Sequence, residues 1–431
     1  MSLWRLSEFF KRNYKGFLVA CIIIYHFVIA GLFIHTFKIL PYELFWITEA
    51  GILLLFIFSC IYCCRSYGLR RLLSFPKVYY LIMFFFLWGL VTSIVNSINL
   101  LTFLLQVKDY IRFVIFGFAV INLGLSKTEI KWLIFLILGI ILLQVPISAV
   151  QCALWTLGDW CVGTLSAGAT ASMAFLCSIG TVLVIILYVF YKKRVFLLGL
   201  VPLFSLPIIF GNSQMGIFLY PYSFLFVLFY APTQTFKPVL AAFLFTGLFI
   251  TVLYFLLPPF QTTTKRYISL IGVAAQNQFV LSPDTTGRMR APGAAIKRLV
   301  QKDNGFIFGY GFGATKKSYW KKLAGNFDNR KIAANQISAL LIETGIPGLL
   351  FVSLFTIWLL VETGSLSFQF DGFSRVVTST TFFASTLLIL GSLYFKVYKS
   401  HYFIFLYWLF FGLSYSIKKN SIDFFTNSAN I

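Results

Sequence analysis

Long apolar runs, separated by short polar segments, repeat along almost the whole chain. A helix needs about 20 apolar residues to cross the hydrocarbon core of a bilayer, and most of these runs reach that length. Twelve runs qualify, and they centre on residues 17–35, 44–64, 78–98, 107–125, 132–151, 166–191, 195–210, 215–231, 238–257, 337–362, 376–395 and 402–417. The pattern predicts an all-α, polytopic membrane protein with about twelve transmembrane helices. The two shortest runs share the polar break 211–214 and form the least regular hairpin.

One polar segment is far longer than the others. Residues 258–334 separate the ninth apolar run from the tenth. We therefore expect nine transmembrane helices in residues 1–257, one large, partly helical extracytoplasmic loop in 258–334, three helices in 335–417 and a cytoplasmic tail in 418–431. The sequence contains no internal repeat and no linker, so these parts are expected to form one membrane domain.

Positive charges orient the predicted helices. With a cytoplasmic N-terminus, the short inner segments hold 17 Lys and Arg, and the short outer loops hold three, Lys38, Lys396 and Lys399. Lys and Arg in short loops favour the cytoplasmic side, whereas long loops cross regardless of charge. The count predicts a bacterial inner (plasma) membrane protein with both termini in the cytoplasm. The 258–334 loop then lies outside, with 13 Lys and Arg against three Asp.

The composition makes lipid the main solvent. Hydrophobic residues are 59% and charged residues 11% of the 431 residues, whereas soluble domains have about 45–50% and about 25%. Membrane lipids are therefore expected partners, and a nucleic-acid partner is a poor fit for an exported basic loop. Cys152 and Cys161 flank a predicted outer segment, where a disulfide and two free thiols both remain open.

The long loop contains two local patterns. The segment 284–288 has the polar capping residues of a helix start, and the apolar positions behind it leave Lys297 and Arg298 on another face. Gly309-Tyr310-Gly311-Phe312-Gly313 permits a tight turn, without the strand and helix of a dinucleotide site. The basic excess fits either a patch on anionic lipid headgroups or a site for an anionic ligand such as a lipid-linked diphosphate, which Arg binds bidentately.

Few titratable side chains are available for catalysis. None of the three His lies in the loop, and the outer segments lack the cluster of carboxylates that a divalent ion needs. Neither a metal nor another cofactor is therefore expected. Lys108, Asp109 and Arg112 lie in the fourth run, where they are either functional or neutralise one another. Glu343, early in the tenth run, is either a base or a hydrogen-bonded structural carboxylate.

Three ordered motifs resemble the O-antigen ligase/polymerase superfamily. They are Thr286-Gly287-Arg288, the glycine run 309–313, and Asn335-Gln336 followed by the stretch 340–350. Members of that superfamily share a G-R, a later G-x-G, and a stretch of the form H-N-x-x-L-x-x-L-x-E-x-G-x-x-G. The likeness covers about residues 286–352, with weaker likeness at 163–165 and 212–214.

The resemblance implies a GT-C-like architecture and metal-independent transfer of a saccharide from a polyprenyl-diphosphate carrier outside the membrane. Arg288 matches the family's G-R arginine, and in this family arginine side chains hold the diphosphate leaving group. Asn335 matches the Asn that follows the family's His. The residues expected to bind substrate are Arg290, Lys297, Arg298, Asn335 and Gln336.

Two positions depart from the family pattern. The family's His falls on Ala334, and the S-R-G of the span before the loop is Ser213-Gln214-Met215 here. In the ligase branch that His is a proposed base, whereas polymerases vary more at the position. Ala334 therefore marks either a catalytic position without its usual base or an inactivating substitution, and it favours the polymerase branch.

The expected function is a membrane glycosyltransferase that polymerises polyprenyl-diphosphate-linked oligosaccharide repeat units of an O-antigen, capsule or exopolysaccharide, with a chain-length regulator as a candidate partner. An O-antigen ligase is the close alternative, and a rod-shape type peptidoglycan glycosyltransferase comes third. From another class, a lipid-linked oligosaccharide flippase also has about twelve helices. A flippase should have short loops and twofold internal similarity, so the long basic loop favours an enzyme.

Overall fold

The computed structural model describes residues 13–37, 39–69, 72, 76–155, 158–166, 168–191, 194–211, 213–256, 261, 265, 291–317, 323–327 and 334–428. The elements in these residues are all helices: α2 (Tyr14–Ile24), η1 (Tyr25–Thr36), η2 (Tyr42–Phe45), α3 (Trp46–Tyr67), α5 (Val78–Val95), α6 (Leu100–Asn122), α7 (Lys127–Trp155), α8 (Thr170–Phe190), α9 (Phe196–Leu200), η3 (Pro202–Phe204), α10 (Ser205–Phe210), α11 (Gln214–Tyr230), α12 (Pro232–Leu256), α14 (Ala291–Val300), α15 (Gly305–Phe308), α16 (Gln336–Gln369), α17 (Gly372–Tyr394), η6 (Val397–Lys399) and α18 (His401–Ser428). The prediction of an all-helical chain is confirmed for the part that the structure describes.

The predicted apolar runs all fall on helices. Within the described residues, eight helices are long and apolar enough to cross a membrane. The runs that formed the least regular hairpin are shorter apolar helices, Phe196–Phe210 and Phe218–Tyr230. The remaining two runs are α6 and α18, which are long but carry more polar side chains. The chain is therefore a polytopic helical membrane protein.

Large apolar side chains cover the outside of the helix bundle. Leu54 in α3, Ile94 in α5 and Leu248 in α12 are 67%, 69% and 62% exposed. Contiguous apolar surface of this kind does not face water in a stable soluble protein. Helices satisfy their own backbone hydrogen bonds, which lets them present such a surface to lipid.

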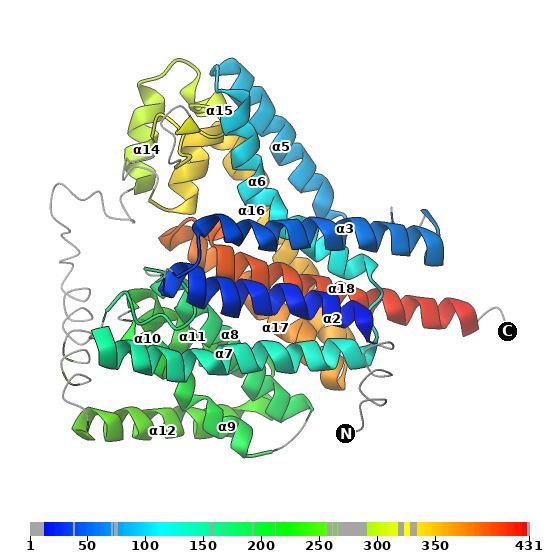
Figure 1. Ribbon diagram of the computed structural model, residues 1–431, viewed down its shortest axis with the longest axis vertical. Helices are drawn as coiled ribbons and strands as arrows, with labels where there is room; N and C mark the ends of the chain where they lie inside the picture. Colours follow the sequence, from blue (N-terminus) through cyan, green and yellow to red (C-terminus); the bar gives the residue numbers. More distant parts are fainter. Residues whose placement is uncertain are drawn as a thin grey trace.

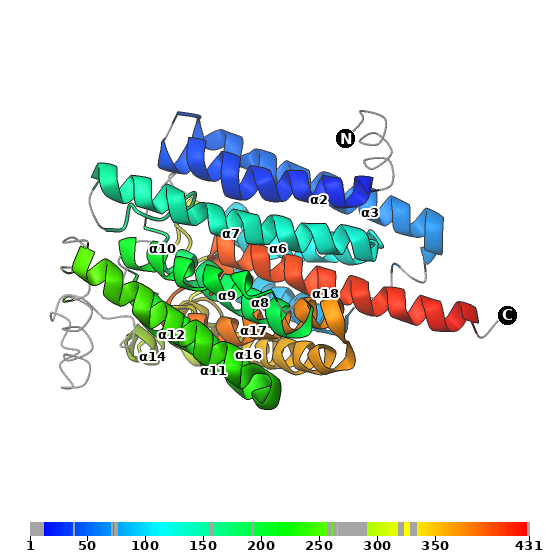
Figure 2. The ribbon, with the colours of Figure 1, turned by 90° about the horizontal axis from the view of Figure 1, so that it is seen from below.

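The long helices run side by side, with the short helices of the 291–327 segment at one edge. Helices α2, α3, α7 and α18 follow nearly one direction in both views (Figure 1, Figure 2). Helices α14 and α15 lie beside the turn between α5 and α6, on the opposite side of the molecule from α12 (Figure 1). Both short helices pack against α16.

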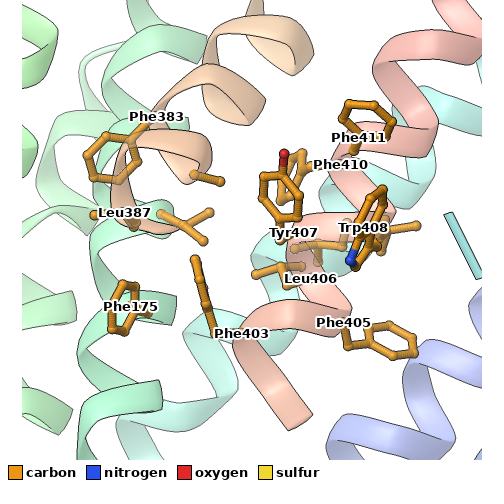
Figure 3. Packing of buried hydrophobic residues seen from close by; sticks show 14 of the residues in the cluster. Phe175, Phe383, Leu387, Phe403, Phe405, Leu406, Tyr407, Trp408, Phe410 and Phe411 are labelled. Carbon is orange, nitrogen blue, oxygen red and sulfur yellow. The ribbon is translucent and has the colours of Figure 1, made fainter. Parts of the chain in front are cut away.

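Helix α18 fills the middle of the bundle. Every residue from Tyr402 to Ile417 is buried. Its aromatic rings meet side chains from α8 and α17, and the Phe403 and Phe175 rings pack at a tilt with their centroids 4.3 Å apart (Figure 3). Aromatic side chains bury more area than any others, so this packing is expected to hold much of the bundle together.

One end of the bundle joins segments that were predicted to be cytoplasmic. The Lys15 ammonium donates to the Tyr62 hydroxyl at 2.7 Å, and Lys419 donates to the Asn122 side chain at 3.1 Å. These contacts connect the beginning of α2, the end of α3, the end of α6 and the late part of α18.

The other end joins segments that were predicted to be extracytoplasmic. The Gly158 N–H donates to the Phe210 carbonyl at 3.1 Å, and the Gln336 N–H donates to the Phe395 carbonyl at 3.1 Å. The second bond attaches the turn between α17 and α18 to the first residue of α16. Because the 291–327 segment packs on α16, this end of the bundle carries the described part of the long loop.

Candidate functional site

Helix α16 is broken at Gly345. This residue has φ 66° and ψ −164°, a conformation that only glycine adopts readily, and Pro347 follows within the helix. Two carbonyl groups beside the break accept hydrogen bonds from other segments. The Ile342 oxygen accepts from Tyr310 N–H at 2.6 Å, and the Thr344 oxygen accepts from the Trp88 indole at 3.0 Å. The break therefore serves as an attachment point for the loop.

The glycine run 309–313 makes that attachment close. Gly309, Gly311 and Gly313 all have positive φ, at 60°, 96° and 110°. A Cβ atom on Gly309 would lie 2.7 Å from the Ile342 oxygen, and one on Gly345 would lie 2.5 Å from a loop carbonyl oxygen. The loop and the helix thus approach backbone to backbone. This explains the glycine pattern through packing and requires no nucleotide.

Phe312, between two of these glycines, anchors the loop in the bundle. Its side chain is fully buried, with ring centroids 5.4 Å from Phe85, 5.9 Å from Phe103 and 5.6 Å from Tyr110. The Ser93 hydroxyl also donates to the Phe312 carbonyl at 3.1 Å. The next residues of the loop are consequently held over the ends of α6 and α16.

Glu343 is the centre of a buried polar cluster. Its side chain has no exposed area and lies 3.6 Å from the Lys399 ammonium. The Gln106 amide donates to both carboxylate oxygens, at 2.7 and 2.8 Å, and the Thr315 hydroxyl donates to one of them. Of the two interpretations left open by the sequence, these contacts match the hydrogen-bonded carboxylate.

Asn335 and Gln336 hold the beginning of α16 in place. The Asn335 side chain accepts from Ser338 N–H at 2.9 Å as the helix cap, and its amide donates to the Leu393 carbonyl at 3.0 Å. Gln336 donates to the Tyr110 hydroxyl at 3.1 Å. Both side chains, expected to bind substrate, are buried and are used by the protein itself.

Three lysines from two segments surround this cluster. Lys316 forms an ion pair with Asp109. Lys399 pairs with Glu343, and its ammonium lies 5.4 Å from the centre of the Tyr110 ring. Lys396 donates to the Thr315 hydroxyl at 3.4 Å. Burial and the charges of Lys399 and Lys317 lower the pKa of the Lys396 ammonium to about 8, and Glu343 opposes this change.

An apolar pocket adjoins the polar cluster. It has an empty volume of about 450 Å³, part of it open at the surface, and is lined by side chains of α5, α6, α16 and α18. Tyr110 borders the pocket, and the Lys399 ammonium of the polar cluster lies 5.4 Å from the centre of its ring. Tyr398, which also borders the pocket, directly precedes Lys399 in the chain. A polar, cation-rich site and an apolar pocket thus share a wall.

The charged residues in α6 find partners outside their own helix. Glu49 of α3 pairs with Arg112 at 2.8 Å and with Lys108 at 3.0 Å, whereas Asp109 pairs with Lys316 of the loop. Of the two alternatives that the sequence left open, mutual neutralisation of Lys108, Asp109 and Arg112 does not match these ion pairs. Side chains three or four positions apart share one helix face, but here the acid and the bases face different neighbours.

Of the other five candidate residues, the structure describes Lys297, Arg298 and Ala334. Lys297 and Arg298 are exposed on α14, whose buried residues Ala295 and Leu299 pack in the loop's small core. Ala334 is half-buried, directly before the cap of α16. Arg288 and Arg290 lie outside the residues that the structure describes.

Cys152 and Cys161, for which a disulfide was left open, are not joined by a disulfide in the structure. Burial raises the pKa of the Cys161 thiol to about 11. A thiol with so high a pKa is a weak nucleophile near neutral pH, so no catalytic role is assigned to either residue.

Four residues of the cluster belong to no motif: Gln106, Thr315, Lys396 and Lys399. Gln106 is a polar residue at the edge of an apolar run, and the two lysines are two of only three basic residues in the short outer loops. The unusual positions of Gln106 and of these two lysines are the signals in the sequence that could have indicated a role in the site.

No protein-family model matches the chain, and none of the curated proteins is significantly similar to it.

Proposed function

We propose that this chain is a metal-independent membrane glycosyltransferase that polymerises polyprenyl-diphosphate-linked oligosaccharide repeat units. The observation that carries the proposal is the shared wall between the Glu343 cluster, with its lysines, and the apolar pocket. A polyprenyl-diphosphate donor has an anionic head and a long apolar chain. A site for such a donor therefore needs cations and an apolar surface side by side.

The proposed orientation places this end of the bundle on the outer face of the membrane, with twelve transmembrane helices and both termini in the cytoplasm. The support is the asymmetry of 17 basic residues in the inner segments against three in the short outer loops. Repeat units carried on an exported lipid would then reach the site from the outer leaflet.

The cations of the site would stabilise the leaving diphosphate. By resemblance, the Arg288 guanidinium can neutralise the charge that builds on the phosphate oxygen as the sugar leaves. Lys316 and Lys399 are already neutralised by carboxylates. Arg288 would therefore supply most of the new stabilisation.

Two features support the polymerase over its rivals. Ala334 stands where the ligase branch has its proposed base, so an O-antigen ligase remains the alternative with less support. A flippase needs a route for a large polar head through the middle of the bundle, whereas α18 fills that middle with buried aromatic side chains. A chain-length regulator protein is a further proposed partner.

The lipid-linked saccharides of a strain that lacks this chain test the proposal. Loss of a polymerase should leave single repeat units on the lipid core. Long chains that stay on the polyprenyl carrier would point to a ligase instead, and accumulation of repeat units on the cytoplasmic side would point to a flippase. Unchanged saccharides would contradict all three assignments.

A further inference from the structure

Lys396, Thr315 and Glu343 form a linked row of polar groups. The Lys396 ammonium donates to the Thr315 hydroxyl at 3.4 Å, and the same hydroxyl donates to the Glu343 carboxylate. Thr315 is 1% exposed and Glu343 is fully buried, whereas Lys396 is half-buried and forms the outer end of the row. Thr315 thus links the Lys396 ammonium to the buried Glu343 carboxylate.

Lys396 differs from its neighbours in its charge partners. Lys399 pairs with Glu343, and Lys316 pairs with Asp109. Within the described residues, no carboxylate forms an ion pair with Lys396. The charged groups that influence it are Lys399 beside it on the same turn, Lys317 on the loop and Glu343 on α16.

The position of Lys396 also relates to the beginning of α16. The Gln336 N–H donates to the Phe395 carbonyl at 3.1 Å. Lys396 follows one residue after Phe395, and Ala334 precedes Gln336 by two residues. This hydrogen bond therefore joins two short segments. One contains Ala334, whose side chain has no titratable group, and the other contains the half-buried amine of Lys396.

Transfer of a sugar to a hydroxyl group requires a group that accepts a proton. Glu343 already accepts three hydrogen bonds and has no exposed surface. Lys316 and Lys399 form ion pairs with Asp109 and Glu343. Within the described part of the site, Lys396 is a half-buried amine without a carboxylate partner, and burial lowers its pKa to about 8.

We propose that Lys396 is the general base of the transfer reaction, positioned by Thr315; this inference rests on the proposed function. The acceptor hydroxyl oxygen forms a bond to the anomeric carbon of the donor sugar. The bond from that carbon to the diphosphate oxygen breaks, and its electron pair leaves with the diphosphate. The hydroxyl proton moves to the Lys396 nitrogen and then to solvent water.

The proposal predicts a specific pH dependence. A base must be unprotonated, so kcat/KM, which reports the free enzyme, should rise with pH. With the pKa of Lys396 near 8, the rise should level off above about that pH, whereas an ordinary lysine would delay it to a pH of about 10.4. Glu343 raises the pKa of Lys396, so Glu343→Gln should move the rise to lower pH.

The test uses the purified full-length protein and undecaprenyl-diphosphate-linked repeat units extracted from the deletion strain. Lys396→Met and Lys396→Arg should both lower kcat/KM by about 10² or more, the usual contribution of a general base. Lys237→Met, which removes an exposed lysine at the beginning of α12, should retain turnover. If Lys396→Arg restores activity, Lys396 acts only as a positive charge and the proposal is overturned.

A second measurement needs neither substrate nor a variant. Competitive acetylation of the wild-type protein across pH, followed by mass spectrometry of the Lys396 peptide, reports when its amine becomes free. A midpoint near pH 8 supports the proposal, and a midpoint near that of exposed lysines overturns it. If the wild-type protein transfers saccharide but Lys396 is dispensable, this inference fails alone. If the wild-type protein transfers nothing, the proposed function fails with it.

Discussion

Asn335 occupies the cap position of α16, where the first backbone N–H groups of a helix have no partner within the helix. Its side-chain oxygen accepts from Ser338 N–H, and the Ser338 hydroxyl reaches back toward the Asn335 N–H at 3.3 Å. This reciprocal arrangement is a capping box. A residue that matches a family motif can therefore owe its identity to the fold of the site and not to contact with substrate.

Substitution of Asn335 separates these two roles. Asn335→Ala should destabilise the protein by about 1 kcal/mol, the usual effect of losing a cap. Asn335→Ser retains a capping oxygen and should recover most of that stability. Thermal unfolding of the purified variants in detergent measures both effects. If Asn335→Ser is as stable as the wild-type protein but transfers no saccharide, Asn335 contacts the substrate after all.

Single residues of the site could be predicted from the sequence only where a local pattern marked them. Glu343 was visible as a carboxylate inside an apolar run. Its partner Gln106 lies 237 positions away in the chain, and a single sequence without the fold gives no means to pair them. Lys396 was counted among the outer lysines, but its burial depends on how α16 and the α17–α18 turn meet.

At the scale of elements, the helices follow from hydropathy, but their irregularities do not. The first run becomes an α-helix that continues as the π-helix η1, and the run at 195–210 is divided into α9, η3 and α10. An apolar composition favours burial in lipid whatever the exact helical geometry. The break in α16 depends instead on Gly345 and on the loop that docks against it.

A Gly345→Ala substitution tests whether that break holds the loop. The positive φ of 66° and the loop oxygen 2.5 Å from a Cβ atom both oppose a side chain. We expect a loss of about 1–3 kcal/mol, the scale of a residue forced into such a conformation, measured by thermal unfolding. Gly139→Ala is the matched control, since no atom lies within 4 Å of its Cβ position in α7. Equal stability of the two variants would show that the break is not needed for docking.

At the scale of the whole molecule, the alternation of apolar runs predicts which segments meet at each end of the bundle. It does not predict which helices are central. Helix α18 takes the middle although its sequence is less apolar than that of several outer helices. It contacts α6, α17 and α8, and its rings pack against side chains of its neighbours (Figure 3). The shared wall of the polar cluster and the apolar pocket arises from this packing and from the docked loop together.

Chain elongation by the purified protein tests the proposed function most directly. Incubated with undecaprenyl-diphosphate-linked repeat units, it should produce a ladder of longer lipid-linked saccharides and release one undecaprenyl diphosphate for each bond formed. Arg288→Ala should lower the rate by about 10² to 10³, the scale of losing one preorganised donor, and Lys321→Ala should cost little. A protein that produces no ladder and releases no diphosphate, or equal small losses in the two variants, would contradict the proposal.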